Sequence, residues 1–227
     1  MKLLVNKIYD KAQIFETVQG EGLQSGVASF FIRLQGCNVR CFFCDEKATW
    51  KHDSKEFVNA MEIDEIINEL ENINPNLKRI VITGGEPSEQ NLVPFINKLH
   101  KNGFKVALET AASGEFIKNI LDLKEKIQDE SLWITFSPKQ IYSANGESAD
   151  ERIWQLANEI KFVFASEKAG TYLVNEIFKK AKKTMPIFLM PDWNNRLQYQ
   201  EEIFNILKIY PSSCRLGIQA HKFWGLL

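Results

Sequence analysis

Apolar runs with the length of strands alternate with amphipathic helical segments along most of this chain. Ala28 to Leu34 is a nearly continuous apolar run, typical of a strand covered on both faces. Met61 to Ile73 carries apolar residues at helical spacing with acids between them. Because such pairs recur about six times, the pattern predicts parallel strands joined by right-handed crossovers. Six units instead of the eight of a closed barrel indicate an open, partial (β/α)6 barrel.

The expected elements follow in order, in one domain over residues 1–227. Strands are expected at 28–34, 79–83, 105–109, 132–137, 159–164, 187–190 and 215–219. Helices are expected at 61–73, in the segment that follows the Gly84-Gly85 pair up to His100, and at 115–126, 169–183 and 197–209. The remaining long segments are expected to be a strand or hairpin (2–17), an irregular stretch (45–60) and a polar loop (140–150).

Three of the four cysteines, Cys37, Cys41 and Cys44, fall within eight positions. An odd number of cysteines so close in sequence makes poor disulfide partners. Zinc would need a fourth ligand, either His52 or Cys214, and neither gives a familiar zinc spacing. Three cysteines around a [4Fe–4S] cluster would leave one iron without a protein ligand and open to chemistry. The spacing favours the cluster over zinc and over a redox or incidental group of thiols.

Composition narrows the class of partner. Lys+Arg 28 against Asp+Glu 29 gives a net charge of −1, so no overall basic field attracts nucleic acid or an anionic membrane. A small-molecule partner is favoured. The first residues form too short an apolar run for a signal peptide, and no uninterrupted apolar segment of about 18 residues occurs. Unpaired cysteines fit a reducing compartment, so we expect a cytoplasmic protein.

Candidate ligand residues follow the predicted strands directly. Cys37 comes after one strand, Thr83 to Pro87 after the next, and Ser137 to Lys139 after a later one. The loops after barrel strands meet at one face, which carries the active site in barrel enzymes. Arg33, near the end of its apolar strand, is either a surface charge or an anion clamp in that pocket, and the neighbouring cysteine loop favours the clamp.

The C-x3-C-x2-C loop, followed about forty residues later by Thr83-Gly84-Gly85-Glu86-Pro87, resembles the signature of the radical S-adenosylmethionine (SAM) enzymes. The resemblance implies that Cys37, Cys41 and Cys44 hold a [4Fe–4S] cluster whose open iron binds SAM. It also implies that a 5′-deoxyadenosyl radical forms on one-electron reduction. The fold that the resemblance implies is the same partial (β/α)6 barrel.

Further segments resemble the 7-carboxy-7-deazaguanine synthase family of the queuosine and deazapurine pathway. They lie at 17–22, 31–37, 133–139 and 215–222, and the Gln-Gly-Glu-Gly turn and the closing Gln-x-His-Lys are the most specific. The family's reaction is the ring contraction of 6-carboxy-5,6,7,8-tetrahydropterin to 7-carboxy-7-deazaguanine with loss of ammonia. The resemblance also implies an electron donor such as flavodoxin or ferredoxin, and a homodimer.

Residue roles carry over from this resemblance position by position. The SAM site would include Gly84, Gly85, Glu86, Ser137, Pro138 and Lys139. The substrate site would include Val18, Gln19, Gly20, Arg33 and Thr83. Main-chain groups and an amide match the donor and acceptor edge of a pterin, and a guanidinium matches its carboxylate. His221 and Lys222 either reach the substrate's carboxylate or form an ordinary polar tail.

The chain departs from the family pattern after the cysteine loop. Glu46 stands where the family has a threonine whose hydroxyl binds a magnesium ion. A carboxylate is a harder and charged ligand, so we expect a cation near Glu46. Two alternatives remain at this level: a radical SAM enzyme that activates a glycyl-radical protein, and a non-catalytic zinc or iron–sulfur module.

Overall fold

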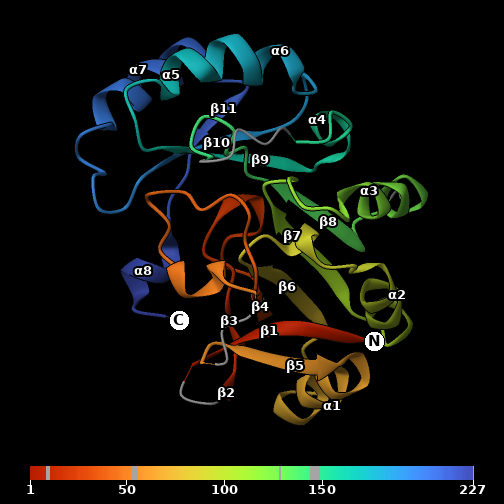
Figure 1. The fold of residues 1–227 in the computed structure, drawn as a ribbon. Helices are drawn as coiled ribbons and strands as arrows, with labels where there is room; N and C mark the ends of the chain where they lie inside the picture. The colour runs from red at the N-terminus through yellow and green to blue at the C-terminus, as the bar shows by residue number, and fades with distance from the viewer. Residues whose placement is uncertain (9–10, 53–55, 128, 144–148, 227) are drawn as a thin grey trace.

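The computed structural model describes residues 1–8, 11–52, 56–127, 129–143 and 149–226. Its backbone is one large sheet with helices along its outer side (Figure 1). The strands are β1 (Lys2–Ile8), β2 (Lys11–Ala12), β3 (Ile14–Val18), β4 (Ala28–Leu34), β5 (Val58–Glu62), β6 (Arg79–Gly84), β7 (Lys105–Thr110), β8 (Leu132–Phe136), β9 (Glu159–Phe164), β10 (Ile187–Pro191) and β11 (Cys214–Leu216).

The α-helices are α1 (Ile63–Ile73), α2 (Val93–Lys101), α3 (Ile117–Lys126), α4 (Ile153–Leu156), α5 (Ala169–Tyr172), α6 (Phe178–Lys180), α7 (Gln200–Ile209) and α8 (Ala220–Trp224). Three 3-10 turns, η1 (Gly22–Gln24), η2 (Lys47–Trp50) and η3 (Pro87–Glu89), and one π-helical segment, η4 (Leu173–Ile177), complete the described elements.

The strand order is β11-β10-β9-β8-β7-β6-β4-β1-β2, with β3 paired to β4 and β5 paired to β1. From β4 through β11 along this order, every neighbouring pair is parallel. The two ends of the order differ, so the described sheet is open. Each parallel strand from β4 to β10 is followed by helix before the next parallel strand. The expected partial (β/α)6 barrel is therefore confirmed.

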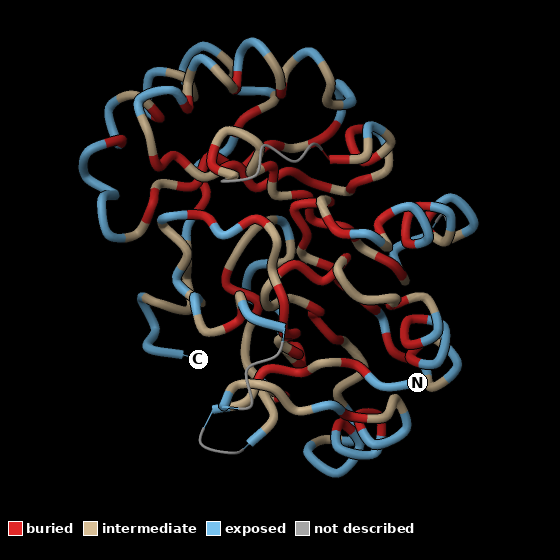
Figure 2. Tube along the Cα trace, in the orientation of Figure 1, coloured by how far each residue is buried: buried red, intermediate tan, exposed pale blue. Residues whose placement is uncertain are grey.

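Local sequence explains the helices that cover the sheet. At the start of α1, Glu62 and Glu65 form a reciprocal capping box, which satisfies two backbone N–H groups that a helix start leaves open. The inner face of α1 buries Ile66, Ile67 and Leu70. Figure 2 shows buried residues gathered on the strands and on the inner faces of the helices. The core between these layers includes Phe30, Phe95, Phe136, Phe162 and Phe164.

The structure differs from the expected elements where tertiary pairing decides. Residues 58–62, expected to be irregular or the start of a helix, form β5, which pairs antiparallel with β1. The expected helix 169–183 is α5, the π-helical segment η4 and α6. The short α4 and α8 were not expected. The centre of the expected polar loop, 144–148, and residues 9–10 of the expected hairpin lie outside the described residues.

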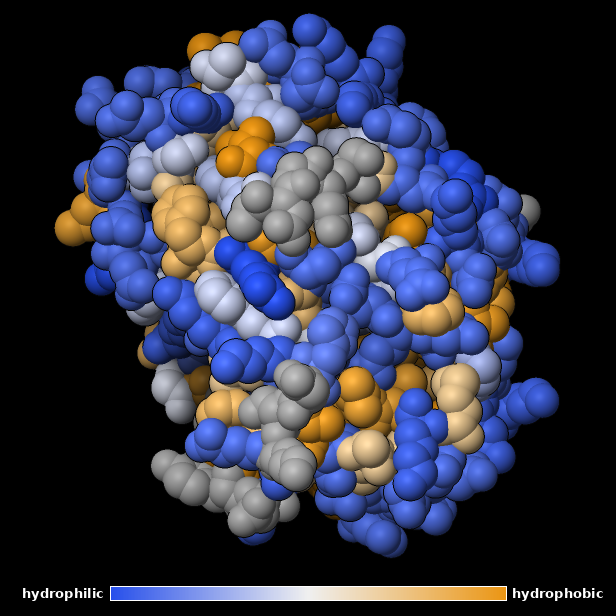
Figure 3. Space-filling model, in the orientation of Figure 1, coloured by the Kyte–Doolittle hydropathy of each residue, from blue (hydrophilic) through white to orange (hydrophobic). Residues whose placement is uncertain are grey.

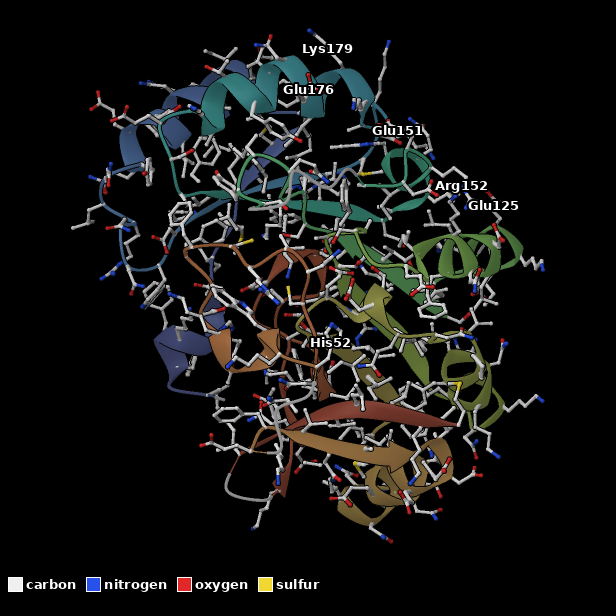
Figure 4. All side chains as sticks on the ribbon, in the orientation of Figure 1. His52, Glu125, Glu151, Arg152, Glu176 and Lys179 are labelled. Atoms are coloured by element: carbon white, nitrogen blue, oxygen red, sulfur yellow. The ribbon has the colours of Figure 1, made fainter. Side chains whose placement is uncertain are left out.

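The outer surface is polar. Figure 3 shows hydrophilic side chains over most of the visible face, with hydrophobic ones interspersed. Arg152, the residue directly before α4, lies 2.6 Å from Asp122 and 3.6 Å from Glu125 of α3, and Figure 4 shows Arg152 and Glu125 side by side at the surface. Such exposed pairs contribute about 0–1 kcal/mol each. Within the described residues, no helix has the length and apolar character needed to cross a bilayer.

Candidate active site

A cavity of about 580 Å³ lies where the parallel strands end. The residues that follow β4, β6, β8 and β10 all contribute to its wall, as the barrel rule predicts. Most of the residues singled out in the sequence line it: Val18, Gln19, Arg33, Cys37, Cys41, Cys44, Glu46, Thr83, Gly84, Gly85, Glu86, Ser137 and Lys139. Gly20 and Pro138 are not part of the lining.

The cysteine loop follows β4 and lies in front of the sheet in Figure 1. Its backbone turns at Arg40, whose φ is 52°, and the N–H of Cys44 donates to the carbonyl of Cys41 at 3.0 Å. All three cysteines of this loop line one cavity. Burial raises the pKa of the Cys37 thiol to about 11.

The zinc interpretation does not fit the donor set. Among the described residues, no group of three or more His, Cys, Asp or Glu side chains lies close enough to hold a single metal ion. His52 faces Glu89, with Nε2 at 3.1 Å from the carboxylate (labelled in Figure 4). Cys214 is buried at the start of β11 and does not line the cavity. A [4Fe–4S] cluster, which spreads its cysteine ligands over several irons, suits the three sulfurs better.

Two glycines at the end of β6 bring the cysteine loop against the sheet. A Cβ on Gly85 would lie 2.0 Å from the carbonyl oxygen of Gly36, and a Cβ on Gly84 would lie 2.2 Å from the backbone nitrogen of Leu34. The N–H of Glu86 donates to the same Gly36 carbonyl at 2.7 Å. The family resemblance places both glycines in the SAM site. In the structure their lack of side chains first serves the packing of two backbone segments.

Glu86 is 2 % exposed and both its carboxylate oxygens accept hydrogen bonds. The N–H of Ala111 donates to it at 2.7 Å and the N–H of Ser88 at 3.0 Å, and the hydroxyls of Ser88 and Thr110 also donate to it. Burial raises the pKa of Glu86, and these hydrogen bonds oppose the rise. Glu86 therefore joins the residues that follow β6 to the end of β7. Because both its oxygens already accept hydrogen bonds within the protein, few acceptor positions remain for a cofactor.

Ser137 and Lys139 lie beside the cysteine loop, as expected. Lys139 Nζ donates to Ser137 Oγ at 2.6 Å and lies 5.5 Å from the centre of the Phe43 ring. Burial lowers the pKa of Lys139, and Cys41 is the negative group that most strongly opposes this. An ammonium next to the cluster ligands favours negative charge at this part of the cavity.

Arg33 enters the cavity from β4. Its Nη2 lies 3.7 Å from Glu46 Oε1, and its buried Nε has no hydrogen-bond partner. A buried guanidinium N–H without a partner is costly unless a ligand completes it. The pairing with Glu46 and the open Nε together fit a clamp for a carboxylate or a similar anion.

The groups of the Gln-Gly-Glu-Gly turn are largely engaged within the protein. The backbone N–H of Gln19 donates to Val27 at 2.9 Å, and the Gln19 carbonyl accepts from Gly26 at 2.8 Å. Its side-chain amide donates to Glu109 Oε1 at 3.0 Å. The carbonyl of Gly20 accepts from Ala220. The turn is thus held rigidly at the cavity wall, with fewer free main-chain groups than the sequence suggested.

The segment before and within α8 covers the same wall. A Cβ on Gly20 would lie 2.1 Å from the ring of His221, so this contact requires glycine. Gln219 Nε2 donates to Glu21 at 2.8 Å, and Lys222 Nζ lies 3.3 Å from Asp45 Oδ2. Both His221 and Lys222 line the cavity. They are therefore part of the cavity wall and not a separate tail, while their contact with the substrate stays a prediction.

Three charged groups in the cavity were not predicted from the sequence: the buried Lys161 and the half-buried Glu21 and Glu109. Lys161 Nζ lies 2.6 Å from Glu21 and 2.8 Å from Glu109, and Thr83 Oγ1 donates to Glu109 at 3.1 Å. The available signal was a charge at alternate positions of a buried strand, as at Lys161 within Glu159–Phe164.

Comparison with known proteins agrees with this site. The family model of a 4Fe-4S single cluster domain matches residues 18–132. The 7-carboxy-7-deazaguanine synthase of Buchnera aphidicola subsp. Schizaphis graminum is 35% identical, over 95% of this chain and 97% of that protein. The protein of the same name from Synechocystis sp. is 32% identical, over 98% and 96%. The crystal structure of QueE from Escherichia coli superposes with a TM-score of 0.76 at 26% identity, covering 97% of this chain and 95% of that one.

The fold and the cysteine loop define the class, an α/β protein built around the domain of a single 4Fe-4S cluster. Within that class the identity to the relatives extends over nearly the whole chain, including the strands that follow the matched domain. The chain belongs to the 7-carboxy-7-deazaguanine synthase family.

Proposed function

We propose that this protein is a radical SAM enzyme that converts 6-carboxy-5,6,7,8-tetrahydropterin to 7-carboxy-7-deazaguanine with loss of ammonia. The main support for this proposal is that three cysteines and Arg33, whose Nε has no hydrogen-bond partner, line one cavity at the ends of the strands. Family membership supplies the reaction, and the cavity supplies groups that match its participants.

The residues present fit a cluster and SAM. Cys37, Cys41 and Cys44 would hold the cluster, and the cavity wall beside Gly85, Ser137 and Lys139 would take SAM. Bound together, these two groups supply hydrogen-atom abstraction. Lys139, buried next to Cys41, would offset the negative charge of the thiolates.

The protein's own contribution to the reaction is positioning and exclusion of water. Arg33, with its open Nε, would orient the substrate's carboxylate from β4, and Thr83 would place a hydroxyl beside the ring. The wall formed by Gln219, His221 and Lys222 would enclose the substrate. Holding the reacting carbon in one place is the main requirement of an enzyme whose cofactor carries the chemistry.

Direct assay of the reaction tests this proposal. Protein reconstituted under anaerobic conditions is expected to be brown and to cleave SAM when reduced. With the carboxypterin present, mass spectrometry should detect 7-carboxy-7-deazaguanine, and ammonia should be released in equal amount. SAM cleavage without any carboxypterin-dependent product would contradict the substrate, and a colourless protein inert toward SAM would contradict the class.

We also propose that a magnesium ion binds at Glu46. This carboxylate lines the cavity and is one third exposed, with Arg33 at 3.7 Å as its partner. Magnesium is commonly held by one or two carboxylates, with water and substrate oxygens completing its shell. Glu46 would supply a carboxylate oxygen to the ion, and the substrate's carboxylate would bind the ion from the cavity side.

Removal of magnesium tests Glu46. Wild-type protein treated with a chelator is expected to lose turnover by about tenfold or more and to regain it when magnesium is added. Losses of this size are typical when the groups that orient a metal site are changed. Glu46→Thr, which keeps an oxygen, should still respond, whereas Glu46→Leu should not. Calorimetric titration gives an independent measurement, with magnesium binding detected in the wild type and absent in Glu46→Leu. A wild type indifferent to magnesium in both measurements would refute the site.

Other expectations are part of the same proposal. We propose one domain over residues 1–227, supported by the single sheet and shared core. A one-electron donor such as flavodoxin or ferredoxin, a homodimer and a cytoplasmic location stay predictions from the family resemblance.

A further inference from the structure

Lys161 is a buried cation between two carboxylates on the cavity wall. The residue is 5 % exposed, and its Nζ lies 2.6 Å from Glu21 Oε2 and 2.8 Å from Glu109 Oε1. It comes from β9, while Glu109 comes from β7 and Glu21 from the turn before η1. One side chain therefore joins three separate parts of the cavity.

The two carboxylates connect Lys161 to further parts of the cavity wall through hydrogen bonds. Gln19 Nε2 and Thr83 Oγ1 donate to Glu109 at 3.0 and 3.1 Å. Gln219 Nε2 donates to Glu21 at 2.8 Å. The turn, the end of β6 and the segment before α8 thus depend on the orientation of two carboxylates, and these in turn depend on Lys161.

The two carboxylates lie close together in a cavity, and the positive charge of Lys161 is what stabilises them there. Burial lowers the pKa of Lys161, and the two carboxylates more than reverse this, so its pKa lies above the usual range. Burial raises the pKa of Glu21, and Lys161 more than reverses that, so its pKa lies below the usual range. The other titratable groups that interact with this cluster are Lys139 and His221. Lys139 is bonded to Ser137, and Lys222 is paired with Asp45, so neither replaces Lys161.

We propose that Lys161 is a positioning residue that keeps Glu21 ionised and holds both Glu21 and Glu109 in place, and that the substrate-binding wall formed by Gln19, Thr83 and Gln219 depends on it. In this proposal the lysine acts on substrate binding through the two carboxylates. The proposal rests on the proposed function only for the reaction used to measure its effect. The ionisation state of Glu21 can be measured without that reaction.

The test compares three variants of the reconstituted holoenzyme. Lys161→Met removes the charge and keeps the length. Lys161→Met combined with Glu21→Gln removes one positive and one negative charge and so restores the original balance. Lys124→Met is the matched control, because Lys124 is also a buried lysine but its Nζ donates to a backbone carbonyl, that of Leu132, at 2.6 Å. Cluster content and circular dichroism verify that each variant is folded and loaded.

For Lys161→Met we expect kcat/KM for the carboxypterin to fall about 100-fold at pH 7, mostly through KM, because removing one partner of a buried charge pair leaves the other uncompensated. The pKa of Glu21 should rise, so kcat/KM should increase with pH over a range where the wild type is flat. The double variant should lose this pH dependence. Lys124→Met should match the wild type in KM and in pH profile.

A Lys161→Met enzyme with wild-type KM and a flat pH profile would overturn the proposal. A fall in activity with no change of pH profile, not relieved in the double variant, would also overturn it, because it would indicate a merely structural role. If the wild type does not convert the carboxypterin, the proposed function fails while this inference is still tested. Carbon-13 NMR of labelled glutamate in wild type and Lys161→Met should then show a raised Glu21 pKa in the variant, and an unchanged Glu21 pKa would refute the inference.

Discussion

Replacing Cys41 with alanine is expected to abolish reductive SAM cleavage, with a fall of at least about 1,000-fold, because the cluster carries the chemistry and the protein only positions it. Cys41 is the most deeply buried of the three loop cysteines, at 7 % exposed, and it lines the cavity. Two thiolates would hold the cluster too weakly to survive reduction. Iron content and absorbance near the cluster band measure cluster loading, and chromatography of SAM products measures cleavage.

Cys214→Ala is the matched control for this loss. Cys214 is as buried as Cys41, at 4 % exposed, so both variants lose a similar amount of packing, about 1 kcal/mol. It does not line the cavity, and burial raises its pKa to about 11. Cys214→Ala should therefore keep full iron content and SAM cleavage. The cluster assignment would be contradicted if Cys41→Ala retained both, or if Cys214→Ala lost both.

The parallel part of the sheet could be predicted from the sequence because strands that are covered on both faces appear as continuous apolar runs. Glu159–Phe164 and Ala28–Leu34 are both predicted with the bounds observed. Val58–Glu62 has no such run, and it becomes a strand because β1 offers it a partner nearly sixty residues away. Local pattern cannot supply this kind of information. The same holds for the π-helical segment η4, which interrupts a stretch predicted as one helix.

The cysteines were predictable because a local spacing holds all three, whereas the charged cluster around Lys161 is assembled from strands far apart. Lys161 and Glu109 are separated by 52 positions, and Lys161 and Glu21 by 140. Each residue alone resembles an ordinary charge on a strand. Only the fold shows that Glu109 of β7 and Lys161 of β9 line the same cavity.

Gly84 and Gly85, at the end of β6, have both a packing role and an expected role in cofactor binding. The family resemblance places Gly84 and Gly85 at the cofactor, and glycine lets a backbone approach a ligand. The structure brings the same two residues against Leu34 and Gly36, the residues that lead into the cysteine loop. The two roles are compatible, since a loop held against β6 also fixes where its sulfurs face. The conformation of the loop then depends on an absent side chain as much as on the cysteines.

Gly85→Ala is accordingly expected to destabilise the protein by about 3 kcal/mol or more, at the upper end of the cost of overpacking. The added methyl group would lie 2.0 Å from the carbonyl oxygen of Gly36, and both sides of this contact are backbone, so no side chain can rotate away. Relief requires the cysteine loop to move off β6, which breaks the 2.7 Å hydrogen bond from Glu86 N–H to Gly36. Chemical denaturation measures the stability, and iron content measures cluster loading, which we expect to fall with it.

Gly103→Ala separates this clash from the general cost of replacing a glycine. Gly103 has a φ of +79° and open space around its Cβ position, so its variant carries only the backbone cost, about 1 kcal/mol. It should load iron like the wild type. Equal losses of stability in the two variants, with full iron in both, would mean that the approach of Gly85 to Gly36 does not hold the cysteine loop. A larger loss confined to Gly85→Ala, with less iron, would show that the position of the three sulfurs depends on this backbone contact.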